Sequence, residues 1–430
     1  MNVTFVWIGV AIYVIASLML AYYSRTGKAK DMTDYFLGNR MMGGVVSALS
    51  YSATTFSAFM LVGLAGLTYA GGVGALGFEL IYFAGVSLIA FFGPRYWVAG
   101  KKYGYVTPTE MLGDRYNSKS VAVVTAIASC LFLIPYSAVQ LTGVGYLLSS
   151  MSNHEISFTT GVTIATVLAI VFTIIAGIRS VMWTDAFQAL LMIITATLVV
   201  LIVISRLGGF GNFFGTLEAE HPGSLTVPGN GYFSFPMFLS LTLPWIFFSI
   251  SNPQVSQRLF MPASFKSMRT MLLGFLVFGF IYTLVAILWG YAALIKFPDL
   301  DNPDLATPTL LASDIVPPIL AVIVMIGIMA AAVSTIDSII LTLSSMVARD
   351  VYGNAKRNPS ERRQLLVGKI VIPIIAVLAY LFAQLQLDLI AVLSVSASAG
   401  LLVIVPAYIG VFFWKRDRKS TRLNSSHTAE

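Results

Sequence analysis

One apolar stretch of this sequence is unusually rich in hydroxyl groups; it reads Ser47-Ala48-Leu49-Ser50-Tyr51-Ser52-Ala53-Thr54-Thr55-Phe56-Ser57. Six of these eleven residues are serine or threonine, and glycines flank the stretch at Gly43, Gly44, Gly63 and Gly66. In a lipid bilayer, the backbone can leave the helical conformation only where its polar groups line a protein cavity. We therefore expect a membrane-spanning helix that is broken here, beside an internal binding site.

A similar interruption stands in the other half of the chain. The apolar run 234–252 contains Pro244 and leads into Ser249-Ile250-Ser251-Asn252-Pro253-Gln254. Interruptions at corresponding positions of two halves are the best sequence indication of a transport site. Serine and threonine also hold membrane helices together without binding anything. That interpretation is favoured for a single hydroxyl, whereas the dense cluster favours a site.

The composition indicates a membrane protein. The chain has 430 residues, of which 57% are hydrophobic and only 10% are charged. A soluble domain carries about 25% charged residues, so most of this surface must face something other than water. This excludes a cytosolic enzyme, a nucleic-acid-binding domain and a disordered chain. The single cysteine, Cys130, excludes an intrachain disulfide and a cysteine metal cage.

We expect eleven membrane-spanning helices, because crossing a bilayer takes about 20 mainly apolar residues. The apolar stretches lie near 3–23, 42–70, 76–98, 121–149, 158–178, 182–205, 234–252, 270–296, 315–347, 365–385 and 388–414. The first stretch lacks the basic leader of a signal peptide, and Arg25 and Lys28 follow it instead of a cleavage site. We therefore interpret it as a retained span.

The basic residues predict the orientation. All of the 26 lysines and arginines except Arg206 and Lys296 follow odd-numbered spans. Loops rich in these residues stay in the cytoplasm. We therefore expect a multi-pass protein of the cell (inner or plasma) membrane, with its N-terminus outside and its C-terminus in the cytoplasm. The net charge of +7 then reflects membrane topology and not a nucleic-acid partner.

The polar outer segment 206–233 divides the chain into two halves of five spans each. The first half covers 42–205 and the second covers 234–414. Because five is odd, the halves have opposite orientations, as in the inverted repeats of many secondary transporters. Any protein with eleven spans can be cut this way, but the paired interruptions favour a true repeat. Residues 1–41 then form a leading helix with a cytoplasmic loop, and 415–430 form a polar cytoplasmic tail.

Two acidic residues lie deep within apolar stretches. Asp185 belongs to the sixth stretch and Asp337 to the ninth. Acids inside a membrane are costly and are functional by default. Ser334 shares a helical face with Asp337 and Ser338, and hydroxyl and carbonyl oxygens suit a hard cation such as sodium. Glu79 and Asp388 open the third and eleventh stretches near the interfaces, where we expect structural roles.

Several motifs together resemble the sodium/solute symporter family, which includes the sodium–glucose, proline, pantothenate and sialic acid transporters. They are the runs Asp34-Tyr35-Phe36-Leu37-Gly38, Gly177-Ile178-Arg179-Ser180-Val181-Met182-Trp183-Thr184-Asp185, Asn252-Pro253-Gln254-Val255 with Gln257-Arg258, and Ser334-Thr335-Ile336-Asp337-Ser338. The resemblance covers nearly the whole chain. It implies an all-α integral membrane protein with a LeuT-like core of five plus five inverted helices behind one leading helix.

The same resemblance implies the site residues. Sodium would be bound by the backbone carbonyls of Ala53, Phe56 and Ala331 and the hydroxyls of Ser334 and Thr335. A second sodium site, present in some members, would use Asp185, Ser334, Asp337 and Ser338. Asp337 replaces the serine of the two-sodium pattern, so the stoichiometry stays open. The solute would contact Ser57, Tyr82, Tyr136, Gln140, Trp245 and Ser249.

The expected function is therefore secondary active transport, in which sodium drives symport of a small organic solute by alternating access, and not enzymatic activity. No lysine or arginine is expected in the spans to bind an acidic solute, so the solute is not identified, and the oligomeric state stays open. One rival is proton-coupled symport, since a deep carboxylate binds either cation. The others are an intramembrane aspartyl protease using Asp185 and Asp337 and a sensor that kept a transporter fold.

The last residues, 419–430, resemble nothing in the family. We interpret them as translated adapter sequence or a disordered tail, at the end of a chain that is shorter than many relatives.

Overall fold

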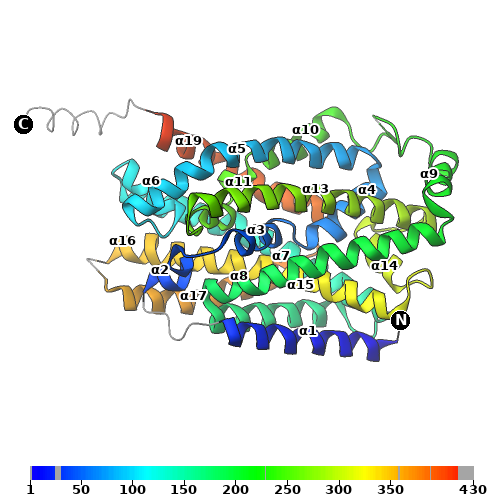
Figure 1. The fold of residues 1–430 in the computed structure, drawn as a ribbon, viewed down its shortest axis with the longest axis horizontal. Coiled ribbons are helices and arrows are strands. Elements are labelled where there is room, and N and C mark those ends of the chain that lie inside the picture. Colours follow the sequence, from blue (N-terminus) through cyan, green and yellow to red (C-terminus); the bar gives the residue numbers. More distant parts are fainter. Residues whose placement is uncertain (1, 25–30, 228, 357–358, 388, 415–430) are drawn as a thin grey trace, which may run out of the picture.

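The computed structural model describes residues 2–24, 31–227, 229–356, 359–387 and 389–414. Within these ranges all regular elements are helices, which lie roughly along one common direction (Figure 1). The tail beyond residue 414 and Asp388 lie outside the described residues. The expectation of an all-α protein is confirmed.

Seven long helices form most of the bundle. They are α1 (Val3–Ser24), α5 (Gly74–Tyr103), α7 (Lys119–Met151), α8 (Phe158–Arg206), α13 (Phe265–Lys296), α15 (Pro318–Met346) and α17 (Glu361–Ala383). Helix α15 lies in the interior and packs against α1, α3 (Gly44–Thr55), α7, α8 (Phe158–Arg206) and α17. From Met329 to Met346 it is buried without interruption, although its sequence is rich in small and hydroxyl residues. Helix α15 is therefore the central helix around which these five helices pack.

Shorter helices connect and cover the long ones. In the first half of the chain they are α2 (Met32–Leu37), η1 (Gly38–Arg40), η2 (Phe59–Leu64), α4 (Ala65–Gly71), α6 (Pro108–Arg115) and α9 (Gly209–Glu220). In the second half they are α10 (Phe235–Ile246), α11 (Phe248–Ser251), α12 (Pro253–Ser256), η3 (Gln257–Phe260), η4 (Pro303–Leu305), α14 (Ala306–Ala312), η5 (Val347–Tyr352), α16 (Gly353–Ala355), α18 (Ile390–Leu401), η6 (Leu402–Ile404) and α19 (Val405–Phe413).

The apolar helices lie at the positions of the expected spans. Among the described residues, eight helices are long and apolar enough to cross a membrane, or nine when the bent pair is counted as one span. Two shorter apolar helices, Phe158–Ile174 and Phe235–Ile246, occupy the positions of the fifth and seventh expected spans. Both interruptions inferred from the sequence are present, because α3 bends by 50° into the helix 59–71 and α10 gives way to the short α11 and α12.

The fifth and sixth spans meet within α8 without a loop. Gly177 has φ 59° and ψ 176°, which lies outside the helical region. A side chain there would be strained at this φ, and its Cβ would come within 3.2 Å of the Tyr35 ring. Glycine therefore permits two membrane helices to join directly, with α2 packed against the junction.

Candidate functional site

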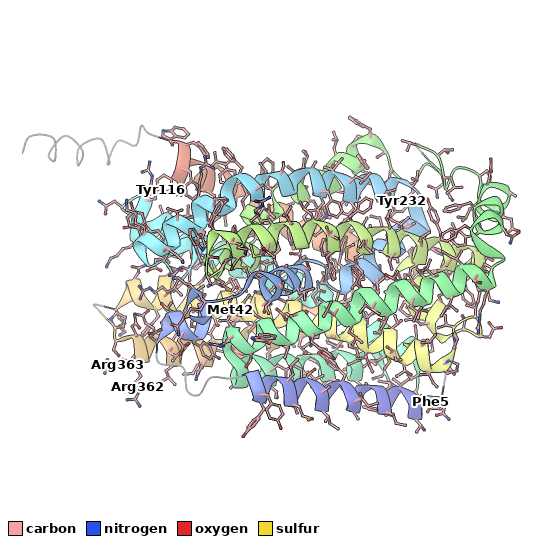
Figure 2. All side chains as sticks on the ribbon, in the orientation of Figure 1. Phe5, Met42, Tyr116, Tyr232, Arg362 and Arg363 are labelled. Atoms are coloured by element: carbon pink, nitrogen blue, oxygen red, sulfur yellow. The ribbon has the colours of Figure 1, made fainter. Side chains whose placement is uncertain are left out.

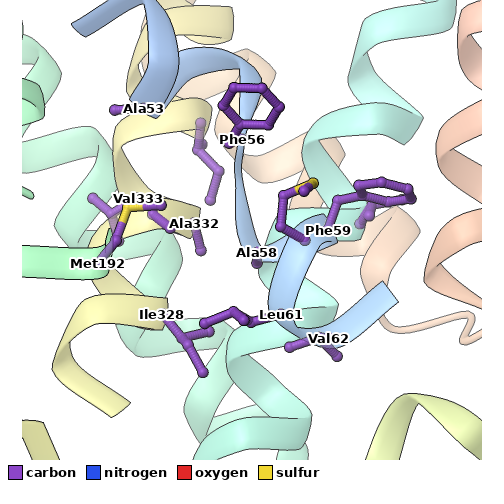
Figure 3. Close-up of a cluster of buried hydrophobic side chains, with 14 of the residues drawn as sticks. Ala53, Phe56, Ala58, Phe59, Leu61, Val62, Met192, Ile328, Ala332 and Val333 are labelled. Carbon is purple, nitrogen blue, oxygen red and sulfur yellow. The ribbon is translucent and has the colours of Figure 1, made fainter. Parts of the chain in front are cut away.

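The break after α3 lies directly against α15. The backbone oxygen of Ala53 accepts hydrogen bonds from the Thr335 hydroxyl at 3.1 Å and from the Ser334 hydroxyl at 3.4 Å. Ser334 also donates to the carbonyl of Ala331 at 3.0 Å. Figure 3 shows Ala53 above Ala332 and Val333 of α15, with a non-helical segment running from Phe56 to Ala58. Two carbonyl and two hydroxyl oxygens from helices far apart in sequence therefore meet at one point.

Local interactions define this break. Phe56 leaves the helix with φ −93° and ψ 82°, while its N–H still donates to Ser52 at 2.7 Å. The Ser57 hydroxyl accepts from the N–H of Phe59 at 3.2 Å and so caps the following helix. The Phe56 ring stacks on Phe275 of α13 at 5.2 Å between centroids. The position of Phe56 is therefore fixed by both its backbone and its ring.

A buried ion pair, which was not predicted from the sequence, lies next to the contact between α3 and α15. Arg258 is 1% exposed, and its Nη2 lies 2.7 Å from Oδ2 of Asp185. The basic-residue pattern counts Arg258 with the loop bases that follow the seventh span, whereas in the structure it lies on η3 and is buried and paired. The same nitrogen donates to Ser338 at 2.8 Å, and Ser50 donates to Asp185 at 2.8 Å. One signal was available, because Arg258 follows the Asn252–Gln257 motif, which resembles transporter sequence.

The four residues expected for a second sodium site are not all drawn together. Ser338 donates to the backbone oxygen of Ser334 at 2.8 Å and, through Arg258, is connected to Asp185. Asp337 instead accepts from Thr173 of α8 at 3.1 Å. The two acids therefore have different partners, and the arrangement does not resemble a protease dyad in which two carboxylates share one proton.

The six residues expected to contact the solute are all buried. They come from the break and from α5, α7, α10 and α11, and three of them surround the ring of Phe248. Centroid distances from Phe248 are 4.6 Å to Trp245, 5.9 Å to Tyr82 and 6.2 Å to Tyr136. Phe248 was not predicted as a site residue, although its spacing of three residues after Trp245 could have indicated it.

Many polar atoms of this group have no partner. Among the described residues, no hydrogen bond is found for the Tyr82 and Tyr136 hydroxyls, the Gln140 amide, the Trp245 indole nitrogen and the Ser249 hydroxyl. Buried polar groups are normally hydrogen-bonded, and unsatisfied ones demand an explanation. A concentration of them in one region is typical of a site that receives a polar ligand or water.

A small cavity of about 10 Å³ lies at the edge of this group; it is lined by Thr55, Phe56, Phe59, Met60, Glu79, Tyr82 and Trp245. Glu79 was expected near the membrane interface in a structural role. It is instead 2% exposed and faces this cavity. Its position three residues before Tyr82, on the same helical face, was the sequence signal that could have revealed it.

A larger cavity, of about 820 Å³, lies at the end of the molecule opposite α9 and α14. Its lining includes Glu110, Asp114, Arg349, Asp350 and Gln364. It contains none of the expected site residues. The ion pair between Arg349 and Glu110, at 2.9 Å, stands in its wall. Figure 2 labels Tyr116, Arg362 and Arg363 at this end and Phe5 and Tyr232 toward the other. The large cavity therefore lies at the basic end and shares no lining residue with the expected sites.

The fold and the broken helices define a multi-pass membrane transporter with a LeuT-like architecture. The model of the family described as "Sodium:solute symporter family" matches residues 35–425, so the chain belongs to this family. The match extends into the tail that we had expected to be unrelated. Sodium is the coupling ion, the cargo is a small organic solute, and the protein is a symporter and not an enzyme, as expected.

The chain covers about four fifths of the length of two named relatives. A "Sodium/pantothenate symporter" of Haemophilus influenzae is 28% identical and is matched over 90% of this chain and 80% of its own length. A "Sodium/proline symporter" of Staphylococcus aureus is 24% identical, with 95% and 81% covered.

Solved structures share the fold. A sodium-coupled sialic acid symporter in a substrate-bound, outward-open state has a TM-score of 0.79 at 20% identity, over 95% of this chain and 86% of that chain. The transporter MhsT in complex with L-phenylalanine has a TM-score of 0.57 at 14% identity, over 86% and 89%.

Proposed function

We propose that the coupling sodium binds where the break after α3 meets α15. Its ligands are the carbonyls of Ala53, Phe56 and Ala331 and the hydroxyls of Ser334 and Thr335. The observation that carries this proposal is the convergence of both hydroxyls on the Ala53 carbonyl, at 3.1 and 3.4 Å. Oxygen ligands from an unwound helix are the usual means of binding sodium at a midplane site. The ion would hold α3 and α15 together.

The solute then binds beside this ion, among Ser57, Tyr82, Tyr136, Gln140, Trp245 and Ser249. The unpartnered polar atoms of this group support the placement. The residues of the break belong to both sites, because Phe56 supplies a proposed ion ligand and also lines the cavity with Trp245. Sodium binding would therefore shape the wall of the solute site, which is the structural basis for coupling.

A second sodium at Asp185, Ser334, Asp337 and Ser338 is a further candidate, favoured by one observation. Arg258 occupies only Oδ2 of Asp185, whereas Oδ1 is buried and has no partner among the described residues. An ion at this second position would use Oδ1, and Asp337 would have to turn away from Thr173. Since Arg258 already neutralises Asp185, this site would be weaker than the first.

For the orientation we propose that the end carrying α6 and α16 faces the cytoplasm. Lys101, Lys102, Arg115 and Lys119 belong to this end, which also carries the 820 Å³ cavity. The segment 206–233, with α9, then lies outside. The division into an inverted repeat of 42–205 and 234–414 is supported by the corresponding breaks at α3 and α10–α12.

Reconstitution into proteoliposomes tests the proposed coupling. A first screen measures thermal stabilisation of the purified protein by proline, pantothenate and sialic acid, each with and without sodium. Uptake of a stabilising solute should then require an inward sodium gradient and rise with an inside-negative potential, which contributes about 2.3 kcal/mol per charge per 100 mV. Unchanged uptake when potassium replaces sodium at fixed pH would contradict sodium coupling and favour the proton-coupled rival.

A further inference from the structure

We infer that Glu79 is the counter-ion of a positively charged group on the solute, so that the transported substrate is a small organic ammonium compound. The inference rests on the proposed function, because it names the chemical class of solute for the same site. Glu79 lies on α5 and is 2% exposed. It lines the cavity on which Thr55, Tyr82 and Trp245 converge. Its carboxylate therefore belongs to the solute site.

The Glu79 carboxylate has no basic partner. Within the described part of the chain it takes part in no hydrogen bond or ion pair, and none of the residues that line its cavity is basic. The buried guanidinium of Arg258 is already paired with Asp185. An unpaired acid inside a membrane is costly and is retained for function. The cavity is therefore electrically suited to a cation.

Aromatic rings form most of the remaining wall. The Trp245 ring lies 5.4 Å from Phe59 and 5.6 Å from Tyr82, and Tyr82 lies 6.2 Å from Phe56, measured between centroids. The faces of such rings attract ammonium groups, and cages of this kind bind quaternary ammonium ligands. The rings and the carboxylate are independent features, and both favour a cation.

The solute should also carry an oxygen atom. The Tyr82 hydroxyl and the Trp245 indole N–H are buried without partners, and the indole nitrogen can only donate. A hydroxyl or carboxylate oxygen, separated from the ammonium group, would accept from these donors. The present cavity of about 10 Å³ holds roughly one water. The rings must therefore separate as the solute enters.

Matched pairs of small molecules test the charge preference. The purified full-length protein, in saturating sodium, is heated with choline or with its uncharged isostere 3,3-dimethylbutan-1-ol, and with L-proline or with cyclopentanecarboxylate, which lacks the ammonium group. We expect an ammonium compound in at least one pair to stabilise the protein while its partner does not. Equal stabilisation by the partner, or no stabilisation by either ammonium compound while sodium still stabilises, overturns the inference.

Variants then assign the preference to Glu79. Glu79→Gln should weaken binding of the ammonium probe about ten- to a hundredfold, the loss of one charge-assisted contact, and leave sodium affinity unchanged. Glu79→Asp keeps the charge and should keep the preference for the ammonium member. Glu218→Gln, on exposed α9, is the matched control and should change nothing.

The sodium readout separates this inference from the proposed function. A shift in sodium affinity in Glu79→Gln, with the ammonium probe bound as before, would make Glu79 an ion ligand and overturn the inference. Failure of sodium to stabilise the wild-type protein at all would contradict the symport proposal itself and, with it, the identity of this site.

Discussion

The Thr335 hydroxyl connects two helices at the proposed sodium site. It reaches from the buried helix α15 to the carbonyl of Ala53, at 3.1 Å, and so connects the two helices that the coupling ion would join. Without an ion, the hydroxyl donates to the carbonyl. With an ion between them, both oxygens become ligands. The same atoms can therefore serve the empty and the loaded states with little movement.

Thr335→Ala removes one oxygen ligand without adding bulk. We expect the sodium concentration for half-maximal solute binding to rise about tenfold or more, as for loss of a contact to a charged group. Because ion and solute affinities are linked reciprocally, solute binding should weaken mainly at low sodium and recover at saturating sodium. The measurement is solute binding against sodium concentration.

The control for this variant is Ser344→Ala on the same helix. The Ser344 hydroxyl donates to Leu341 of its own helix and contacts neither proposed site. Its sodium curve should match the wild type. Coincident curves for Thr335→Ala and the wild type, at equal expression and folding, would show that the hydroxyl is not a ligand.

In the proposed solute site, Trp245 would provide apolar area and one N–H group, but no oxygen. Trp245→Ala should therefore weaken solute binding about tenfold or more, since losing a buried aromatic contact and a donor costs several kcal/mol. Sodium affinity measured without solute should change little. Isothermal titration with each ligand separates the two effects. Trp7→Ala, at a 44% exposed position on α1, is the control; an equal loss of both affinities in Trp245→Ala would remove Trp245 from the pocket.

At the level of the elements, the buried pair of Arg258 and Asp185 connects three segments of the core. Arg258 lies on η3, Asp185 on α8, and Ser338, which also binds Arg258, on α15. Ser50 of the broken helix α3 completes the network by donating to Asp185. The network lies next to the proposed ion site, because Ser338 donates to the backbone oxygen of Ser334, and it connects the helices around that site.

Arg258→Met should lower the thermal stability strongly, because it leaves a buried carboxylate unpaired at a cost of about 3–5 kcal/mol. Adding Asp185→Asn removes that charge and should restore a substantial part of the loss. The exposed pair of Lys296 and Asp314, at 3.6 Å, provides the comparison. Lys296→Met should change stability by less than about 1 kcal/mol. Melting temperatures in detergent distinguish these cases, and a double variant no more stable than Arg258→Met would contradict a direct pairing.

At the scale of the whole molecule, the basic residues and the large cavity share one end. This end contains α6 and the start of α17, and the opposite end contains α9 and α14 (Figure 1). Under the proposed orientation, this large cavity would open toward the cytoplasm. The cavity lined by Glu79 and Trp245 has only about 10 Å³, so its walls must move before a solute can enter or leave.

Thiol labelling in intact cells tests the orientation. In a Cys130→Ser background, Glu218→Cys should react with a membrane-impermeant maleimide, because α9 is expected outside. Arg363→Cys should react only after the cells are opened, because it lies at the basic end. Both positions are exposed in the structure, so protection reports the membrane and not burial. The reverse pattern would invert the proposed topology.

Short-range features of the sequence were sufficient to predict the positions of the apolar helices and of their two breaks. Apolar stretches of about 20 residues determine where helices cross a bilayer, and the hydroxyl cluster at 47–57 and the run around Pro253 correctly predicted the two breaks. Ala53, Ser334 and Thr335 were also brought together as expected. These features depend on hydropathy, backbone preference and spacing along one helix, which are properties that a linear sequence contains.

The partners of the buried charges were decided only by the tertiary structure. Arg258 lies 73 residues from Asp185, and Thr173 lies 164 residues from Asp337, so no local pattern could pair them. Because both residues lie at or just beyond the ends of apolar stretches, the sequence placed Arg258 with the loop bases and Glu79 at the interface. In the structure both side chains are buried by the packing of distant helices. A membrane protein can bury a charge where another segment supplies its partner or its ligand.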